Sequence, residues 1–444
     1  MRMIIIKITI FKCNQTGDIV VSAKKLFISI FLTLCLSLLF APQSFALTLE
    51  EVASRLDKLE QQNKLLRKEN KELRSSIAAT DEKAEAAVVA TEAFTDSTAG
   101  IQKVAEWANR TTIGGYGELH YNNLSGKGGA SDKDEIDFHR FVLFFGHEFT
   151  DDIRFFSELE LEHSIAGDGK AGEIELEQAY IDFDLNDNHT ARAGLFLLPV
   201  GIINETHEPP TFYGTERNPI EKNIVPATWW AAGAGLHGQL GGGFSYDAYV
   251  HSGLNATETD STTKIVSYTS IRSGRQKVSE AVANDPAVTG RLKYTGIPGL
   301  ELAVSAQYQQ DIGQGLVVGL DSGTLIETHA IWNSGPFGIR ALYAAWDING
   351  TAVKAAGADK QEGFYVEPSF KISDQFGVFA RFNQWDNEAG SNTGDAEDTG
   401  KEQWDIGINY WPHEDVVIKA DYQYQNNDNG SDQNGLNVGL GYQF

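Results

Sequence analysis

The most regular pattern in the chain is an alternation of apolar and polar residues that runs from residue 113 to the C-terminus. In the segment 300–309, for example, Leu302 and Val304 alternate with Ser305 and Gln307. A period of two is the pattern of a β-strand with two different faces, because successive side chains point to opposite sides. The alternating runs are about nine to twelve residues long, close to the length of a tilted strand that crosses a membrane.

Short turns and longer polar loops separate these runs in regular succession. The seven short turns are 150–152, 186–188, 241–243, 297–299, 333–336, 373–375 and 412–415. The eight long connections are 122–134, 165–172, 200–232, 255–286, 312–322, 349–360, 388–401 and 428–432. This layout predicts an all-β fold, a sixteen-stranded antiparallel transmembrane β-barrel with both of its ends on the short-turn side. A soluble sandwich or jelly roll is the alternative, but such folds rarely sort their loops by length.

The polar side of the predicted strands carries too many charges to form a packed interior. Glu158 and Glu160, for example, lie on the side opposite to Leu159 and Leu161. A small soluble barrel places its apolar residues inside, whereas here the charged set must line water and the apolar set must face lipid. The alternation therefore predicts a barrel with a water-filled interior.

The chain ends on an apolar row whose last two members are Tyr442 and Phe444. A terminal strand that closes on an aromatic residue resembles the assembly signal of outer-membrane proteins. We therefore expect these two residues to act in the assembly of the barrel.

Residues 1–46 are predicted to be a signal peptide. Two lysines precede an apolar core at 26–40, and Ser44 and Ala46 place small residues at the two positions that a signal peptidase reads. A helical membrane anchor is the alternative, but the apolar run is short for a span. The first twenty or so residues fit no part of a signal peptide, so a further hypothesis is that translation begins near Val20 or Val21.

Residues 47–100 follow a heptad pattern before the period of two begins. The core positions are Leu56, Leu59, Asn63, Leu66, Asn70 and Leu73. Four successive heptads with charged residues on the other faces predict a coiled coil in the periplasm. A linker at 101–112 then leads to the barrel at 113–444.

Composition narrows the function further. Cleavage after residue 46 would remove five of the 36 basic residues, one of the 61 acidic residues and both cysteines, which leaves a net charge near −29. Nucleic acid is excluded as a partner, because no basic surface is left to neutralise phosphates. Thiol chemistry is excluded with the cysteines, the histidines show no zinc-ligand spacing, and no serine lies in a nucleophile elbow. We therefore expect no cofactor, no metal site and no enzyme activity.

The connection at 200–232 joins the fifth and sixth predicted strands and is rich in prolines, aromatic residues and charges of both signs. Its candidate residues for contact with a solute are Glu205, His207, Glu208, Glu216, Arg217, Glu221 and Lys222. The alternative for each of them is that it only fastens the loop to the barrel wall through a salt bridge.

Motifs in and around this connection resemble the phosphate-selective porin O and P family. They are Ala-Arg-Ala-Gly at 191–194, Pro-Val-Gly at 199–201, Pro-Ala-Thr-Trp at 226–229 and Ser-Gly-Leu-Asn at 252–255. The resemblance implies a trimeric outer-membrane porin whose third loop narrows the lumen and through which small hydrophilic solutes or ions diffuse passively. The coiled coil is similar to the periplasmic extension of some sugar-specific porins. Its core asparagines favour dimers, so the choice between dimer and trimer stays open.

The alternation also predicts which charged residues line the pore. The set is Arg140, Glu158, Glu160, Arg192, Arg291, Lys293, Glu367, Lys371, Arg381 and Lys419. Further acidic residues face the same way, so the lumen is mixed to acidic and lacks the arginine ladder of the phosphate-specific members. Rings of charge select ions by sign, so the anion or cation preference and the solute both stay open.

Two other functions compete with passive transport. The first is a structural protein in which the coiled coil contacts the cell wall and the barrel is mainly an anchor. The second is a barrel enzyme, for which we find no ordered catalytic group. The partners expected for the porin are outer-membrane lipid, further copies of the same chain, and the solutes themselves.

Overall fold

The computed structural model describes residues 58, 61, 64–76, 98–256, 270–390 and 399–444. The chain forms two units, Met1–Ala99 and Gly100–Phe444. The predicted signal peptide lies outside the described residues, and so do the predicted coiled-coil positions Leu56, Leu59 and Asn63.

Within the first unit, residues 64–76 are helical, and their predicted core positions Leu66 and Leu73 are more than half exposed. Asn70 lies on the same helix. Among the described residues, no helix is long and apolar enough to cross a membrane. The coiled coil itself stays a prediction.

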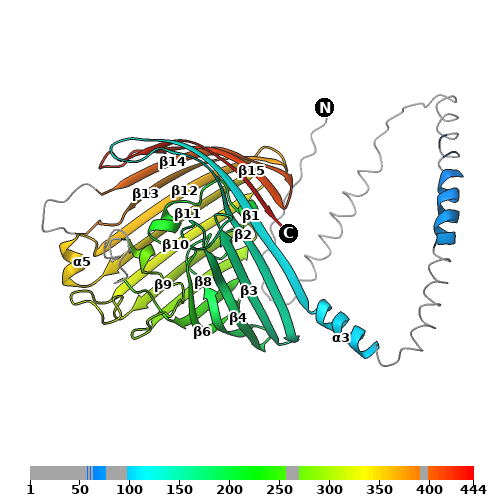
Figure 1. Ribbon diagram of the computed structural model, residues 1–444, viewed down its shortest axis with the longest axis horizontal. Coiled ribbons are helices and arrows are strands. Elements are labelled where there is room, and N and C mark those ends of the chain that lie inside the picture. Colours follow the sequence, from blue (N-terminus) through cyan, green and yellow to red (C-terminus); the bar gives the residue numbers. More distant parts are fainter. Residues whose placement is uncertain (1–57, 59–60, 62–63, 77–97, 257–269, 391–398) are drawn as a thin grey trace, which may run out of the picture. The chain divides into compact units, whose positions relative to one another are not determined.

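The second unit is a closed antiparallel β-barrel of sixteen strands, as the turn and loop pattern predicted (Figure 1). The strands are β1 (Thr111–Gly126), β2 (Lys133–Thr150), β3 (Ile153–Glu162), β4 (Ile174–Asn186), β5 (His189–Leu197), β6 (Trp230–Gly241), β7 (Phe244–His251), β8 (Ala287–Ile297), β9 (Leu300–Gln309), β10 (Gly323–Ser334), β11 (Phe337–Ile348), β12 (Lys360–Lys371), β13 (Phe376–Asp386), β14 (Lys401–His413), β15 (Val416–Gln425) and β16 (Gln433–Gln443). The described helices are α3 (Thr98–Asn109), η1 (Pro209–Thr211), α4 (Ile220–Asn223), η3 (Ile271–Gly274) and α5 (Thr351–Ala355). Each strand pairs with its neighbours in sequence, and β1 pairs with β16 to close the barrel.

All short turns lie at one end of the barrel and all long loops at the other, because every strand runs antiparallel to the next. The turn at 241–243 shows why sequence marks these positions so clearly. Gly241, Gly242 and Gly243 all have positive φ angles, which favour glycine. A Cβ atom on Gly243 would also lie only 2.3 Å from the Cα atom of Gly296 on the next hairpin.

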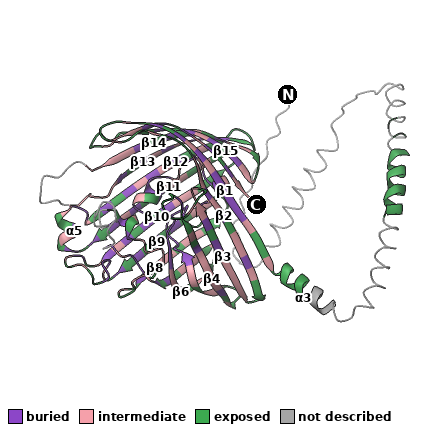
Figure 2. Cartoon of the chain, in the orientation of Figure 1, coloured by how far each residue is buried: buried purple, intermediate pink, exposed green. Residues whose placement is uncertain are grey.

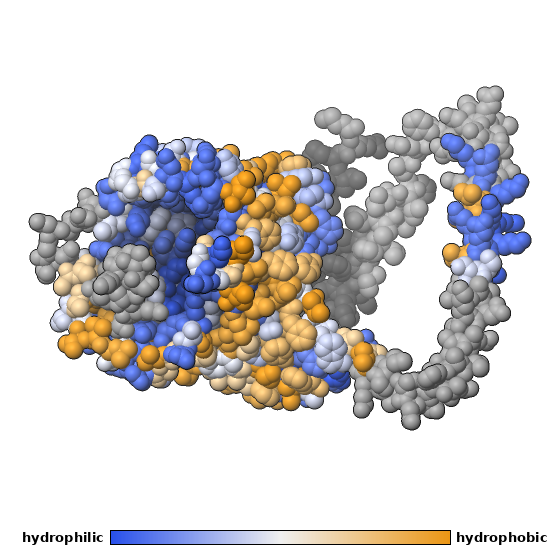
Figure 3. Space-filling model, in the orientation of Figure 1, coloured by the Kyte–Doolittle hydropathy of each residue, from blue (hydrophilic) through white to orange (hydrophobic). Residues whose placement is uncertain are grey.

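The two faces of the strands are inverted relative to a soluble protein. On β9, Leu302 and Val304 are more than 40% exposed on the outside, whereas Ser305 and Gln307 are buried inside. Figure 2 shows buried and exposed positions alternating along the strands, and Figure 3 shows apolar surface over the strands beside a hydrophilic hollow. The predicted orientation of the apolar and polar rows is therefore confirmed.

The last residue takes part in closing the barrel. The backbone of Phe444 exchanges two hydrogen bonds with Gly115 of β1, at 2.9 and 3.0 Å, and its side chain is exposed on the outer face. Tyr442 pairs with Gly117 in the same ladder. The assembly role of Tyr442 and Phe444 remains a prediction, and their position at the seam is consistent with it.

The main apolar core lies inside the barrel, where long loops pack against the wall near the long-loop end. It joins Ile220, Ile224 and Trp229 of the 198–229 segment to Trp346 of β11 and Tyr365 of β12. A barrel that holds only side chains and water needs no such cluster, so this core is the means by which the segment 198–229 is held inside.

Candidate functional site

The segment 198–229, which connects β5 to β6, enters the barrel and contacts the wall on one side through strands β11 and β14. Its carbonyl groups accept hydrogen bonds from inward-pointing side chains. Trp346 Nε1 donates to Ile224 O (2.9 Å), and Asn409 Nδ2 donates to Phe212 O (3.1 Å). Backbone groups of an irregular segment must find partners when they are buried, and the wall supplies them.

The same segment contacts strands β1 and β3 through charged side chains. Glu216 Oε1 lies 3.2 Å from His120 Nδ1 and accepts a hydrogen bond from Asn122 Nδ2 (3.0 Å). His207 Nε2 lies 3.3 Å from Glu158 Oε1. The segment is therefore tied to two separate parts of the barrel wall.

Glu221 organises the segment internally. It is fully buried, and its Oε1 atom accepts hydrogen bonds from the backbone N–H groups of Ile202 (2.6 Å) and Ile203 (2.7 Å). Its Oε2 atom accepts from Asn218 Nδ2 (2.9 Å) and Tyr365 Oη (3.2 Å). Burial raises the pKa of Glu221, although the Ile203 N–H and Asn218 favour the charged form.

Of the other predicted residues in this segment, Lys222 is exposed to the interior, and Glu208 and Arg217 are partly buried. Glu205 forms an ion pair with Arg291 of β8. The structure thus splits the seven candidates into residues with wall or loop partners and residues such as Lys222 that face the cavity.

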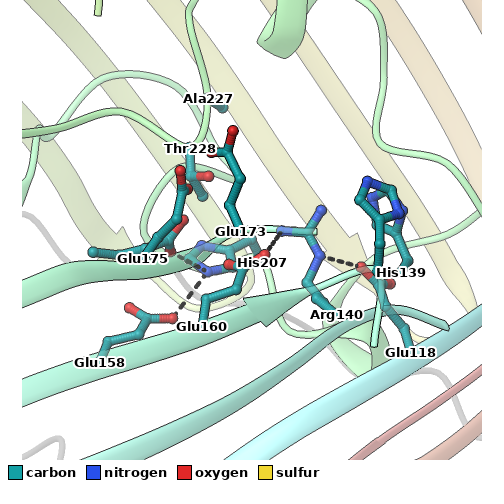
Figure 4. Close-up of polar contacts among 12 residues, drawn as sticks. Glu118, His139, Arg140, Glu158, Glu160, Glu173, Glu175, His207, Ala227 and Thr228 are labelled. Carbon is teal, nitrogen blue, oxygen red and sulfur yellow. Dashed lines mark hydrogen bonds and ion pairs between the residues drawn. The ribbon is translucent and has the colours of Figure 1, made fainter. Parts of the chain in front are cut away.

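Beside the segment, ion pairs link side chains of the neighbouring strands β1, β2 and β3 on the inner face of the wall. The guanidinium group of Arg140 on β2 lies 2.7 Å from Glu118 Oε1 and 3.5 Å from Glu160 Oε1. Figure 4 shows Arg140 between these two carboxyl groups, with His139 on the Glu118 side and His207 in contact with Glu158. All of these side chains except His139 are almost fully buried.

Similar pairs recur around the barrel. Arg381 of β13 lies 3.2 Å from Glu367 and 3.0 Å from Asp405. Arg192 of β5 contacts Asp182 through two hydrogen bonds of 2.8 and 2.9 Å. The predicted lining arginines therefore point inward, but each forms an ion pair with a carboxylate on a neighbouring strand.

The predicted lysines have weaker contacts. Lys293 lies 4.0 Å from Glu301. Lys371 and Lys419 lie over aromatic rings, at 5.5 Å from the Trp411 centroid and 3.5 Å from the Phe212 centroid. A cation over a ring face is attracted by the ring, but the ring carries no net charge and so does not neutralise it as a carboxylate would.

Sequence reasoning missed the contribution of the 252–286 connection. Arg272 and Arg275 donate hydrogen bonds to the carbonyl groups of Ala227 and Thr228, so this connection also holds the 198–229 segment in place. Burial, together with repulsion from Arg275, lowers the pKa of Arg272 to about 9. Lys277 bridges Glu173 (2.8 Å) and Glu175. Loop residues follow no period, so nothing in the pattern indicated that these cations turn inward.

It also missed three residues of β1. Glu118, His120 and Asn122 all point into the lumen, as the alternation on that strand would have indicated. They complete the wall opposite Glu216.

Cavities flank the 198–229 segment at both ends of the barrel. At the long-loop end the cavity has a mixed charged lining, with the basic residues Lys133, Arg140, Arg217, Lys222 and Arg272 and the acidic residues Glu118, Glu162, Glu216 and Glu221. At the short-turn end the cavity is lined by 210–213 together with Arg340 and Lys371. A closed barrel with a polar, charged interior, an apolar outside and a loop folded within is a transmembrane channel.

The chain belongs to the phosphate-selective porin O and P family, whose model matches residues 113–444. It is an outer-membrane porin, a barrel through which small solutes diffuse passively, and both family and fold point to a channel rather than an enzyme. An uncharacterized protein of Aquifex aeolicus (strain VF5) is 31% identical over 355 residues, which cover 72% of this chain and 77% of that protein.

Solved structures with this fold share little sequence with the chain. An anion-selective porin from Comamonas acidovorans superposes with a TM-score of 0.53 at 13% identity, over 75% of this chain and 99% of that one. OmpF of Salmonella typhi, in complex with daunomycin, has a TM-score of 0.52 at 13% identity, over 75% and 97%. The outer-membrane channel DcaP of Acinetobacter baumannii has a TM-score of 0.51 at 13% identity, over 75% and 97%. At this identity the likeness concerns the fold alone.

Proposed function

We propose that the segment 198–229 is the constriction of the channel and that small hydrophilic solutes or ions pass beside it. The observation that carries this proposal is the pair of cavities on either side of the segment. Residues 210–213 line the cavity at the short-turn end, and residues 215–217 line the cavity at the long-loop end. A loop held between two water-accessible spaces limits the size of what crosses.

The charges around the constriction support weak ion selectivity. Basic and acidic residues face the long-loop cavity in similar numbers, and on the wall the arginines are neutralised by ion pairs such as Arg381 with Asp405. Ion selectivity needs an excess of one charge along the path. Among the described residues, neither Lys222 nor Arg272 of this cavity forms an ion pair, so we expect any preference to be for anions and to arise at this end.

A planar-bilayer measurement tests the proposal. We expect an ohmic conductance that organic solutes reduce once they are small enough to enter, and a reversal potential close to zero in a salt gradient. Large, solute-independent conductance would contradict a constriction, and absence of conductance from correctly folded protein would contradict a channel. A strong cation preference would contradict the role of Lys222 and Arg272.

We infer that the long loops face the cell exterior and the short turns face the periplasm, because both ends of the barrel segment lie on the short-turn side. The expected assembly is a homotrimer, with the exposed apolar strand faces in contact with lipid or with neighbouring copies. Chemical crosslinking of the intact protein in detergent tests the trimer, and products that stop at the dimer would contradict it.

The predicted coiled coil at 47–100 is proposed to extend into the periplasm and to be dispensable for transport. Deletion of residues 49–100 behind an intact signal peptide should leave conductance unchanged, because all contacts of the constriction described above lie within the barrel unit. Loss of conductance from a deletion variant that still folds would show that this region takes part in transport.

A further inference from the structure

Two histidines and an aspartate meet at the long-loop end of β2 and β3, at the edge of the charged cavity. Asp137 Oδ2 lies 3.0 Å from His139 Nδ1 and 2.8 Å from His163 Nδ1. The three side chains are between 19% and 36% exposed, so the group is enclosed but open to solvent. His139 also lines the cavity that Glu216, Arg217 and Lys222 face.

Local irregularities of the backbone create this meeting. The register of β1 against β2 shifts between Glu118 and His120, so that two residues of β2 stand opposite one of β1. Such a bulge re-aims a side chain, and here the His139 ring stacks on His120 with centroids 4.7 Å apart. His139 and Arg140 therefore both reach the lumen, although they are neighbours in sequence.

A tight turn directly after β3 is the second irregularity. His163 and Ser164 adopt positive φ angles of 52° and 60°, a conformation that non-glycine residues rarely take. The turn is held by a hydrogen bond from His163 N–H to His139 O (3.2 Å). It brings the His163 ring back onto Asp137.

We propose that Asp137, His139 and His163 form a binding site for a first-row transition-metal ion such as Zn²⁺ or Cu²⁺ at the mouth of the channel. Imidazole nitrogen and carboxylate oxygen are the ligand set that these ions take in proteins, and three protein ligands leave a position open for water. Mg²⁺ and Ca²⁺ prefer an all-oxygen shell, so two imidazoles select against them.

Two of the three distances between ligand atoms need little adjustment to accept the ion, and all three ligand atoms lie within 4.8 Å of one another. Ligand atoms about 2.0–2.1 Å from a tetrahedral Zn²⁺ lie about 3.3 Å from one another. The distances from Asp137 to the two rings, 3.0 and 2.8 Å, must therefore lengthen by only a few tenths of an ångström. In the metal-free protein both rings hydrogen-bond to Asp137, which holds the three ligands in place; on binding, each neutral ring carries its proton on Nε2 instead.

Other groups of potential ligands in the described barrel are less suited to a cation. They are Glu158, Glu177 and His207; Glu162, Glu173 and Glu175; and His413, Glu414 and Asp415. The last group has a single histidine, whose Nδ1 atom accepts a hydrogen bond from the Asp415 N–H group (3.2 Å), and two of its three residues are exposed. Beside the first group, Arg140 already neutralises the neighbouring Glu160. In the second, the Lys277 ammonium group contacts Glu173 and Glu175 and occupies the place of a cation.

A bound ion would change the channel mouth electrostatically. It would add two positive charges on the side of the cavity that Glu216 and His139 line, next to Arg217 and Lys222. We therefore expect Zn²⁺ to move the ion preference of the channel toward anions. This consequence rests on the proposed function, whereas the binding itself does not.

Titration of the purified, folded full chain in detergent with Zn²⁺ tests the site, with binding followed calorimetrically and Mg²⁺ as the comparison ion. We expect one Zn²⁺ per chain and no Mg²⁺ binding at the same concentration. The variants His139→Ala, His163→Gln and Asp137→Asn should each weaken Zn²⁺ binding by about 100-fold or more, which exceeds the 10–100-fold typical of losing an outer-shell partner.

The variant His147→Ala is the matched control. His147 lies eight residues further along β2 and hydrogen-bonds to Thr111, about 26 Å from His139 along the strand. It should bind Zn²⁺ as the unmodified chain does. Equal affinity in the His139, His163 and His147 variants would overturn the proposal, and so would failure of the unmodified chain to bind. The heat-dependent shift in gel mobility of a folded barrel establishes that each variant is folded, and conductance in metal-free buffer tests the channel separately.

Discussion

At the scale of single residues, the interior of this barrel holds many buried charges, and several of them are paired or hydrogen-bonded. Glu221 accepts four hydrogen bonds within and around the 198–229 segment, and Arg381 lies between two carboxylates. Buried charges are tolerated only when they are paired or hydrogen-bonded. The consequence is that the loop position depends on a few side chains whose loss can be measured.

Replacing Glu221 with alanine should loosen the segment. The Ile202 and Ile203 N–H groups would lose their acceptor, and each buried donor left without a partner costs about 1–3 kcal/mol. We expect a higher or fluctuating single-channel conductance and faster proteolysis within 198–229. The control is Thr206→Ser, which keeps the hydroxyl group that donates to Ile202 O (2.8 Å) in the same segment and should change neither; equal effects in both variants would contradict a specific role for Glu221.

The contact between Glu216 and His120 predicts a pH dependence. Burial alone raises the pKa of Glu216, but the hydrogen bond and charge interaction with His120, helped by His139 and Lys222, hold this pKa well below its usual range. A lowered pKa in the folded state stabilises the attachment fully above the ordinary glutamate value, about 4.3, and the stabilisation is lost only as the pH falls below it.

Single-channel recordings between pH 7 and pH 3 check this dependence. Conductance should be steady from pH 7 to pH 5 and change only below about pH 4. In the variant His120→Gln the change should begin at higher pH, because burial then acts on Glu216 without the opposing histidine. Identical pH profiles for the two proteins would refute the assignment.

At the scale of the strands, each element has one face for lipid and one for the interior. On β9 the boundary is sharp, since exposed Val304 is followed directly by fully buried Ser305. The alternation along a strand therefore specifies which side chains face lipid and which face the interior. In a soluble protein, apolar faces exposed to this extent would favour aggregation, whereas here they are the faces expected to contact lipid.

A matched pair of substitutions tests the lipid-facing assignment. Val304→Arg, at the middle of β9, should destabilise the folded barrel by about 2–4 kcal/mol, the cost of a cation on the lipid face near the midplane. Val318→Arg makes the same change at a fully exposed loop position and should stay within about 0.5 kcal/mol. Denaturant unfolding in lipid vesicles measures both. If Val304→Arg also changed the free energy of unfolding by less than about 0.5 kcal/mol, this face would not be in contact with lipid.

At the scale of the whole molecule, the formal net charge of −25 says little about selectivity. Most inward arginines are paired with carboxylates, whereas Lys222 and Arg272 face a cavity of mixed charge. The ion preference therefore depends on which charges lack a partner near the path. The loop connections, more than the strands, decide it.

The variant Arg272→Gln should lower the anion-to-cation permeability ratio. A unit charge about 7 Å from an ion in water contributes about 0.6 kcal/mol, which corresponds to about two- to threefold in the permeability of each ion, in opposite directions for anions and cations. The control is Arg110→Gln, which removes one charge at the short-turn end, where Arg110 contacts Asp151. Reversal potentials in a salt gradient measure both variants, and equal shifts would show that Arg272 acts only through net charge.

The sequence by itself determined the barrel, its strand count and the orientation of its faces. These follow from local rules: a period of two reports two-sided strands, and loops sort by length because antiparallel strands return to the same end. Residues such as Leu302 and Arg381 could be assigned to a face because their strands alternate regularly around them.

Only the tertiary structure decided which residues meet. The inward turn of Arg272 and Arg275, the burial of Glu221 within its own loop, and the approach of His163 to His139 all depend on irregular backbone. Two histidines 24 positions apart show no ligand spacing in the sequence, yet they come together because β2 and β3 are neighbours and a bulge and a left-handed turn re-aim them. Periodicity specifies the face of a strand, whereas contacts between side chains are specified by closure of the barrel and by the loops.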